Sequence, residues 1–471
     1  MESVGSTHKN TSSRETVIHI ESVGSTHKKQ RDEDDIISKL PDSFISHILS
    51  FLPTKDAVRT SVLSKRWIEC WRLITQVNFD DSLFYSPEKK SGGKQCFINF
   101  VNRVLLLSKA CRLESVSLVI TKNYDVSLLN TWISCILNKD VKKLSICSNL
   151  ELNFSALMSR TLFNNSTNLQ ELVLEMRHCA IKVPCWSYYH TSFGNLQVLK
   201  LRGIIFTMDK SYGILLEALK KFEAKNCSWL SSRDATIKAP LLESVLIEQD
   251  LEFVTREPRS CKINFNVSRL KEFTYCGDGI SQAFILSDTS SAHNADANII
   301  LDKRGNSVQE TGSCACLLLK QFSQARCIKF HGSGVLTQQN VAVLPKFAML
   351  SHLELGSVSG EVLLRILQKA PVLNTLFFKE ISKFEQKLLN SAVVPGCFAS
   401  TLKVVKFENV YGSEHELFLA KFFMENGIVL ERMSFSFVDW RWRREKLIEE
   451  FKEKLYSFKK GISFAILEFR Y

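Results

Sequence analysis

The chain has 471 residues, 45% hydrophobic and 23% charged, a composition typical of a folded soluble protein. Its net charge of +12 is spread along the sequence and mixed with acidic residues, so no specific nucleic-acid site is indicated. No apolar run approaches the roughly 20 residues of a bilayer span, and the N-terminus is polar, which excludes a membrane partner and a signal peptide. The 14 scattered cysteines indicate reduced thiols. We therefore expect a protein of the cytoplasm or nucleus.

Residues 1–33 are expected to form a disordered tail, because they are polar and contain few apolar groups. The octapeptide Glu2–Lys9 recurs unchanged as Glu21–Lys28. The short basic run Lys28–Arg31 is followed at once by four acidic residues. This pattern favours a solvated charge run over a nuclear-import signal.

Three short helices are predicted within residues 34–80. Asp42 or Ser43 is expected to cap the first helix, Pro53 to end it, and Thr54 and Ser64 to cap the next two. Ile45, Ile48, Leu49 and Leu52 are expected on one face of the first helix, Ala57, Val58 and Val62 inward on the second, and Trp67, Ile68 and Trp71 on the apolar side of the third. Helices this short bury little surface, so several of these side chains are expected to remain exposed for a partner.

From about residue 100 a template of the form apolar-x-x-apolar-x-apolar recurs every 23–29 residues or so. Leu169/Leu172/Leu174 and Leu350/Leu353/Leu355 are clear copies, and a degenerate copy is expected near Ile299. Each copy predicts a short parallel strand followed by a helical or irregular return, as at 213–220 and 360–369. Such units bury their apolar faces only by stacking, which predicts a curved solenoid at 81–394.

The residues that alternate with the template should face the concave surface of this solenoid. A mixed polar face with occasional apolar groups suits protein recognition, although a merely solvated strand face would look the same. The candidate target-binding residues are Glu171, Glu175, Lys200, Arg202, Phe377 and Lys379.

The C-terminal segment, residues 395–471, changes character. A strand at Leu402–Asn409, a helix at Glu414–Asn426 ended by Gly427, a strand at 430–437, a charged helix at 441–459 and a strand at 463–469 are expected. This segment would cap the open end of the solenoid. The cluster from Trp440 to Arg444 is interpreted as packing at a strand-to-helix junction.

The sequence shows no pattern typical of catalysis. It contains no Gly-rich phosphate loop and no GxSxG motif. Cys314 and Cys316 have no second Cys or His pair at zinc-ligand spacing. We expect a non-enzymatic chain without catalytic residues, metal or cofactor.

Several of these landmarks together resemble a known family. Leu40-Pro41, Ile48, Leu52-Pro53, Asp56 and the run Ser61–Trp67 resemble the F-box of plant proteins. The C-terminal order of elements, with Cys397 before its first strand, resembles the FBD domain of plant F-box proteins with leucine-rich repeats. The resemblance implies an α/β fold in which a small three-helix F-box precedes an irregular leucine-rich-repeat solenoid with parallel strands, capped by an FBD segment.

The same resemblance implies a function. The chain would be the substrate-receptor subunit of an SCF-type cullin ubiquitin ligase, binding a Skp-type adaptor, indirectly a cullin, and an unknown protein substrate. The adaptor-binding residues carried over from the F-box pattern are Leu40, Pro41, Ile48, Leu52, Pro53, Val62, Leu63 and Trp67; the alternative role for several of them is to hold the three helices together. Two alternatives remain: an F-box scaffold or decoy that delivers no substrate, and a basic nucleic-acid-binding repeat protein.

Overall fold

The computed structural model describes residues 36–85, 92–110, 112–150, 162, 168–182, 193–208, 213–231, 235–249, 262–277, 283–287, 295–301, 308–332, 334–381, 393–438, 444–458 and 465–470. The expected N-terminal tail with its duplicated octapeptide, and most of the cluster from Trp440 to Arg444, lie outside these residues.

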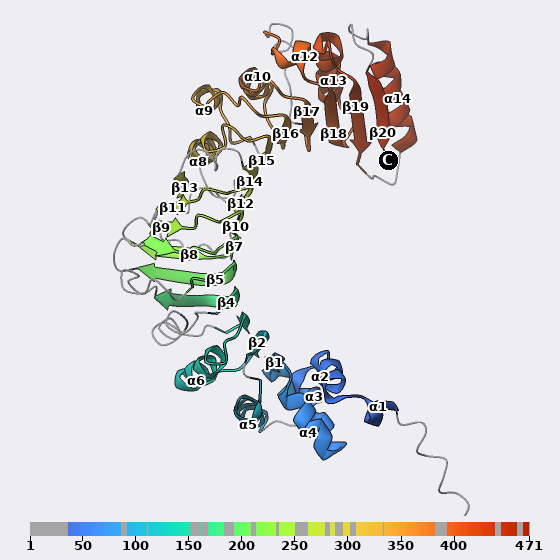
Figure 1. The fold of residues 1–471 in the computed structure, drawn as a ribbon. Coiled ribbons are helices and arrows are strands. Elements are labelled where there is room, and N and C mark those ends of the chain that lie inside the picture. Colours follow the sequence, from blue (N-terminus) through green and yellow to red (C-terminus); the bar gives the residue numbers. More distant parts are fainter. Residues whose placement is uncertain are drawn as a thin grey trace, which may run out of the picture.

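The described chain forms an open arch whose inner side is one long parallel sheet (Figure 1). The strands follow one another in sequence order from the first edge to the last. They are β1 (Gln76–Asp80), β2 (Ser115–Ile120), β3 (Lys143–Ser148), β4 (Glu171–Lys182), β5 (Val198–Met208), β7 (Lys221–Lys225), β10 (Ser244–Glu248), β12 (Glu272–Gly277), β14 (Asp296–Leu301), β15 (Cys327–Gly332), β16 (His352–Leu355), β17 (Thr375–Phe378), β18 (Val404–Val410), β19 (Arg432–Phe437) and β20 (Ile466–Arg470), with β8 (Ser228–Ser231) beside the end of β5. The predicted α/β solenoid with parallel strands is confirmed.

The repeated apolar template forms the core of the arch. Its residues are buried along the sheet, except Leu199 on β5, which is half-buried. The degenerate copy near Ile299 is β14, which pairs with β12 and β15. Toward the C-terminus the aligned positions become a ladder of stacked rings, in which the centroids of Phe407 and Phe435 are 4.9 Å apart.

The outer layer consists of helices at the two ends of the arch and of a second sheet in the middle (Figure 1). The helices are α5 (Gly93–Leu107), α6 (Val126–Leu137), α8 (Val308–Lys320), α9 (Gln338–Ala342), α10 (Gly360–Lys369), α12 (Cys397–Ser400), α13 (Glu414–Asn426) and α14 (Arg444–Ser457). The second sheet contains β6 (Gly213–Leu215), β9 (Ala235–Lys238), β11 (Lys262–Asn266) and β13 (Ala283–Ser287). Gly312 on α8 lies so close to the carbonyl of Val335 that no Cβ fits between them.

The second sheet corrects one expectation. The return at 213–220 was expected to be helical or irregular, but it begins with strand β6. The outer segments of these central repeats are short, and every second residue along them is buried. Ile263 and Phe265 on β11 are examples. Such segments pair as strands, whereas the return at 360–369 carries a helical apolar stripe and forms α10.

The N-terminal helices are α1 (Ile36–Lys39), α2 (Asp42–Ser50), α3 (Thr54–Arg59), the 3₁₀ turn η1 (Thr60–Val62) and α4 (Lys65–Arg72). The expected side-chain caps are absent in this described segment, because Pro41, Pro53 and Ser64 occupy the capping positions without such a hydrogen bond. Instead, Asp42 accepts a hydrogen bond from Arg66 Nε at 2.6 Å. Thr54 Oγ1 accepts one from the backbone N–H of Asn78 on β1 at 2.7 Å.

A buried carboxylate, Asp81, joins the end of β1 to the loop after β2. Asp81 lies in the 3₁₀ turn η2 (Asp81–Phe84) and is fully buried. It accepts hydrogen bonds from Thr121 N (2.9 Å), Thr121 Oγ1 (2.7 Å), Lys122 N (3.0 Å) and Tyr124 Oη (3.2 Å). Burial raises the pKa of Tyr124, so its hydroxyl stays protonated. Thr54 thus joins α3 to β1, and Asp81 joins the turn after β1 to the loop after β2.

The C-terminal strands and helices follow the expected order. Helix α13 covers the predicted residues and begins with a capping box of Ser413 and Glu416. Gly427 ends it, as expected, with a hydrogen bond from its N–H to the carbonyl of Phe423. The described parts of the last helix and strand, α14 and β20, lie at the predicted places.

Candidate functional site

Helix α2 presents two apolar faces. Ile45 and Leu49 are buried and hold the helix against α4 and the core. Phe44, Ile48 and Phe51 follow each other at i, i+4 and i+7 and are all exposed, with Ile48 47% exposed. Ile45, Ile48, Leu49 and Leu52 were expected to share one helical face, and that was wrong. Ile48 and Leu52 are exposed, because one small neighbour cannot cover four apolar positions.

A second group of apolar side chains lies after α3. Val62 is 87% exposed and Leu63 is 62% exposed, because η1 turns the chain outward before α4 begins. Val62 was expected to point inward with Ala57 and Val58, and only those two pack against the core. The exposed apolar residues of α2 and of the segments that follow α2 and α3 are Phe44, Ile48, Phe51, Leu52, Val62 and Leu63, which we call the F-box surface.

The other predicted adaptor-binding residues have mixed positions. Pro41 and Pro53 are exposed at the starts of α2 and α3. Leu40 and Trp67 are half-buried and pack against the core, so part of their role is structural. The α1–α2 turn is held by Arg66, whose guanidinium donates to the backbone carbonyl of Leu40. Sequence reasoning missed Phe44 and Phe51, although their spacing with Ile48 was a readable signal.

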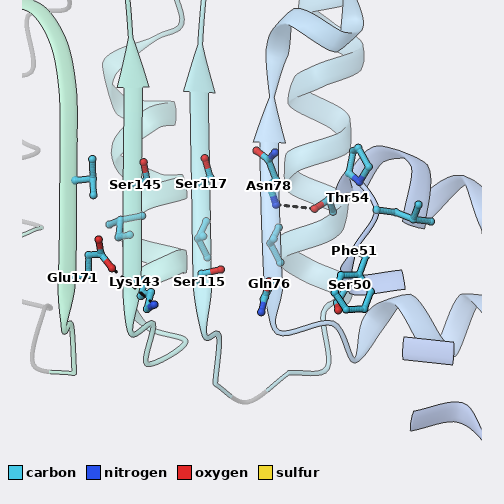
Figure 2. A pocket seen from close by; sticks show the side chains of 16 residues that line it. Ser50, Phe51, Thr54, Gln76, Asn78, Ser115, Ser117, Lys143, Ser145 and Glu171 are labelled. Atoms are coloured by element: carbon cyan, nitrogen blue, oxygen red, sulfur yellow. Dashed lines mark hydrogen bonds and ion pairs between the residues drawn. The ribbon is translucent and has the colours of Figure 1, made fainter. Parts of the chain in front are cut away.

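A cavity of about 510 Å³ lies where the F-box surface meets the sheet (Figure 2). One wall is the α2–α3 turn, with Phe51, Leu52 and Pro53. The floor is the concave face of the first strands, where Ser115, Ser117 and Ser145 are too small to fill the space. The far side is Lys143, Glu171 and Val173. The cavity thus has an apolar wall, a hydroxyl floor and an ion pair at its rim.

The predicted target-binding residues fall into two groups on the concave face. Glu171 forms ion pairs with Lys200 (3.2 Å) and Lys143 (3.9 Å), and Glu175 is the register partner of Arg202 on β5. Phe377 and Lys379 lie at β17, on the other limb of the arch (Figure 1). The structure therefore does not bring all six together, and any one ligand that contacts both groups must be large.

Charges alternate along the concave face. Besides the Glu171 pairs, Lys225 binds Glu248 at 2.7 Å and Lys329 binds Glu354 at 3.7 Å. Acidic and basic side chains that neutralise each other are typical of protein recognition, whereas a phosphate-binding groove presents one sign of charge.

Two observations on the described residues concern metal binding and thiol reactivity. Nowhere in the described ranges do three His, Cys, Asp or Glu side chains gather as metal ligands. Burial raises the pKa of the Cys227 thiol to about 12 and those of Cys316 and Cys397 to about 11, which makes them poor nucleophiles. Within the same ranges, no helix is both long and apolar enough for a bilayer crossing.

Comparison with known proteins agrees with this geometry. The F-box domain model matches residues 37–74, and the FBD model matches residues 390–435. An F-box/FBD/LRR-repeat protein of Arabidopsis thaliana is 27% identical over 453 residues, which cover 93% of this chain and 94% of the relative. An F-box/LRR-repeat protein of the same plant is 26% identical over 85% of this chain and 87% of its own length. Another reaches 42% identity over 120 residues, 26% of this chain and 32% of the relative.

An F-box domain implies binding to a Skp-type adaptor in an SCF complex, and the comparisons therefore suggest a non-catalytic adaptor role in ubiquitin ligation. They also confirm the resemblance found in the sequence: the chain carries an F-box and an FBD domain and is similar over most of its length to the F-box/FBD/LRR-repeat proteins.

Proposed function

We propose that this chain is the substrate-receptor subunit of an SCF-type cullin ubiquitin ligase. The F-box surface binds the Skp-type adaptor, and through it the cullin, while the concave face of the sheet holds a target protein. Ubiquitin transfer takes place on other subunits. This chain contributes proximity, because a tethered target lysine meets the charged conjugating enzyme at raised effective concentration.

The proposal rests on the exposed apolar side chains of a helical unit that is hydrogen-bonded to the first strand of the repeats. Six large apolar side chains are exposed there in a unit of fewer than fifty residues, which is typical of a surface covered by a partner. The hydrogen bond of Thr54 joins α3 to β1, and those of Asp81 join the turn after β1 to the loop after β2. This attachment places the adaptor and the target on the same chain, so that the target is held near the ligase.

We also propose that the chain acts in the cytoplasm or nucleus. Among the described residues, Cys96 and Cys135 are exposed and form no disulfide. A reducing compartment keeps such thiols from pairing.

Reconstitution of the ligase from purified subunits tests the proposal. The full chain is combined with a Skp-type adaptor, a cullin, a RING subunit, activating and conjugating enzymes and a co-purified partner of the concave face. The wild type is expected to bind the adaptor and support ubiquitylation of that partner. Val62→Asp combined with Leu63→Asp is expected to lose both activities while still binding the partner. Leu106→Asp is the matched control, because Leu106 is 83% exposed and belongs to α5, outside the segments that form the F-box surface.

Each alternative has its own outcome in this assay. Adaptor binding without ubiquitylation of any bound partner would favour a scaffold or decoy. Tight binding to random RNA or DNA that weakens steeply with salt would favour a nucleic-acid-binding protein. Adaptor binding that survives the double substitution would overturn the assignment of the F-box surface.

A further inference from the structure

One part of the concave face, on β15 to β18, combines an aromatic ring with lysines. We call it the Phe377 patch, and it consists of Lys329, His331, Glu354, Phe377, Lys379 and Lys406. The strand register places Lys329 opposite Glu354, Glu354 opposite Phe377, and Phe377 opposite Lys406. Lys379 follows two residues after Phe377, and its backbone N–H continues the ladder to the carbonyl of Leu355. Alternation therefore places both lysines beside the ring on one face.

The carboxylate of Glu354 already has partners within this patch. Glu354 is largely buried and forms ion pairs or hydrogen bonds with Lys329 Nζ at 3.7 Å and with His331 Nε2 at 3.0 Å. His331 Nδ1 is buried and has no hydrogen-bond partner in the described structure. Protonation of Nδ1 would leave a buried donor without an acceptor. Burial lowers the pKa of His331, and the nearby carboxylate of Glu354 acts in the opposite direction. His331 is therefore neutral near pH 7 and holds Glu354 in place.

The two lysines beside the ring, Lys379 and Lys406, differ from Glu354 in their ion pairing. Lys379 and Lys406 are exposed, and within the described ranges no ion pair joins either of them to a carboxylate. Glu408 lies on the same face of β18 and is not within ion-pair distance of either lysine. Lys200 and Lys225, on the same concave face, are both paired. The Phe377 patch thus offers two free ammonium groups around a half-buried aromatic surface.

We propose that the Phe377 patch selects the target, and that it binds a peptide segment in which an anionic group, carboxylate or phosphate, lies next to an apolar side chain. The apolar side chain packs on Phe377, and the anionic oxygens accept hydrogen bonds from Lys379 and Lys406. Charge-assisted bonds of this kind are stronger than neutral ones and orient the bound segment. This inference rests on the proposed function, because it names what the concave face recognises.

Selection from a random peptide library displayed on phage tests this inference, with the full chain in complex with its adaptor as the bait. The wild type is expected to enrich peptides with Asp or Glu within two positions of an aromatic or aliphatic residue. Lys379→Gln combined with Lys406→Gln is expected to abolish this enrichment and to weaken the best selected peptide at least tenfold. Lys221→Gln is the control, an exposed lysine on β7 of the same concave face. Synthetic peptides carrying Asp, phosphoserine or Ser at the anionic position then separate carboxylate from phosphate recognition.

Several results would overturn the inference: selected peptides without acidic enrichment, no peptide that depends on the patch, or equal binding of the selected peptide to the double variant. Adaptor binding is measured on the same preparations. If the wild type binds the adaptor but selects no acidic peptides, the inference about the Phe377 patch is refuted and the proposed function is not. Failure of the wild type to bind the adaptor refutes the proposed function.

Discussion

The opposite orientations of Leu63 and Leu49 predict that their truncation has separable effects. Burial of a leucine side chain is worth about 1.5–3 kcal/mol. Leu63 is 62% exposed in the free chain, so roughly 1–2 kcal/mol of this gain is still available to a partner. Leu49 is 1% exposed, so the free energy of burying its side chain already stabilises the folded chain. A change at Leu63 should therefore weaken binding, and a change at Leu49 should weaken the fold.

Val62→Ala combined with Leu63→Ala should weaken adaptor binding by about 2 kcal/mol, which is roughly thirtyfold in Kd. Its free energy of unfolding should change by less than about 0.5 kcal/mol. Leu49→Ala should instead destabilise the chain by about 2–5 kcal/mol, because it leaves a cavity between α2 and α4. Isothermal titration with purified Skp-type adaptor gives Kd, and thermal melting compares the variants. An unchanged Kd for the double variant, or a fall in Tm equal to that of Leu49→Ala, would refute the reasoning.

Three further changes probe the fold. Asp81→Ala should destabilise the chain by about 2–4 kcal/mol in urea unfolding, because it leaves several buried donors without an acceptor; a neutral result would contradict the role of this network. Gly312→Ala should cost about 1–3 kcal/mol because a Cβ there meets a backbone carbonyl, whereas Gly396→Ala, with open space around it, should be tolerated in the same melting assay. The pKa of His331 is lowered by burial, so the stability that it contributes is present above the ordinary histidine pKa of about 6.5 and is lost as the pH falls below it. His331→Gln should lose less stability than the wild type between pH 7.5 and 5, and equal losses would show that another group is responsible.

The solenoid could be predicted from the sequence because its signal is repeated. Each template copy is weak alone, but the copies share one spacing, and a parallel ladder requires that spacing. The degenerate copy near Ile299 was located by this argument, although it lacks the leucines. The second sheet could not be predicted in this way. Strands such as β6 and β9 are three and four residues long, too short for a period to be recognised.

The candidate sites were only partly predictable, for a different reason. The apolar residues of α2 are readable from the sequence, but their orientation depends on how much neighbouring surface is available. Ile48 and Val62 face outward because the small helical unit has no room for them. The cavity depends on Ser115 and Ser145 lying beside the α2–α3 turn, which only the folded chain brings about. No sequence motif marks the hydrogen-bond network of Asp81, because its partners lie about forty residues away in the chain.

Hydrogen exchange of the full chain with and without the purified Skp-type adaptor tests the central claim, which is that one end binds the adaptor and the concave face remains available. The account predicts slower exchange on adaptor binding in residues 42–72, over α2 to α4, and unchanged exchange in the concave strands β5, β7 and β15 to β17. Protection of those strands by the adaptor, or no protection of α2 to α4, would contradict the account.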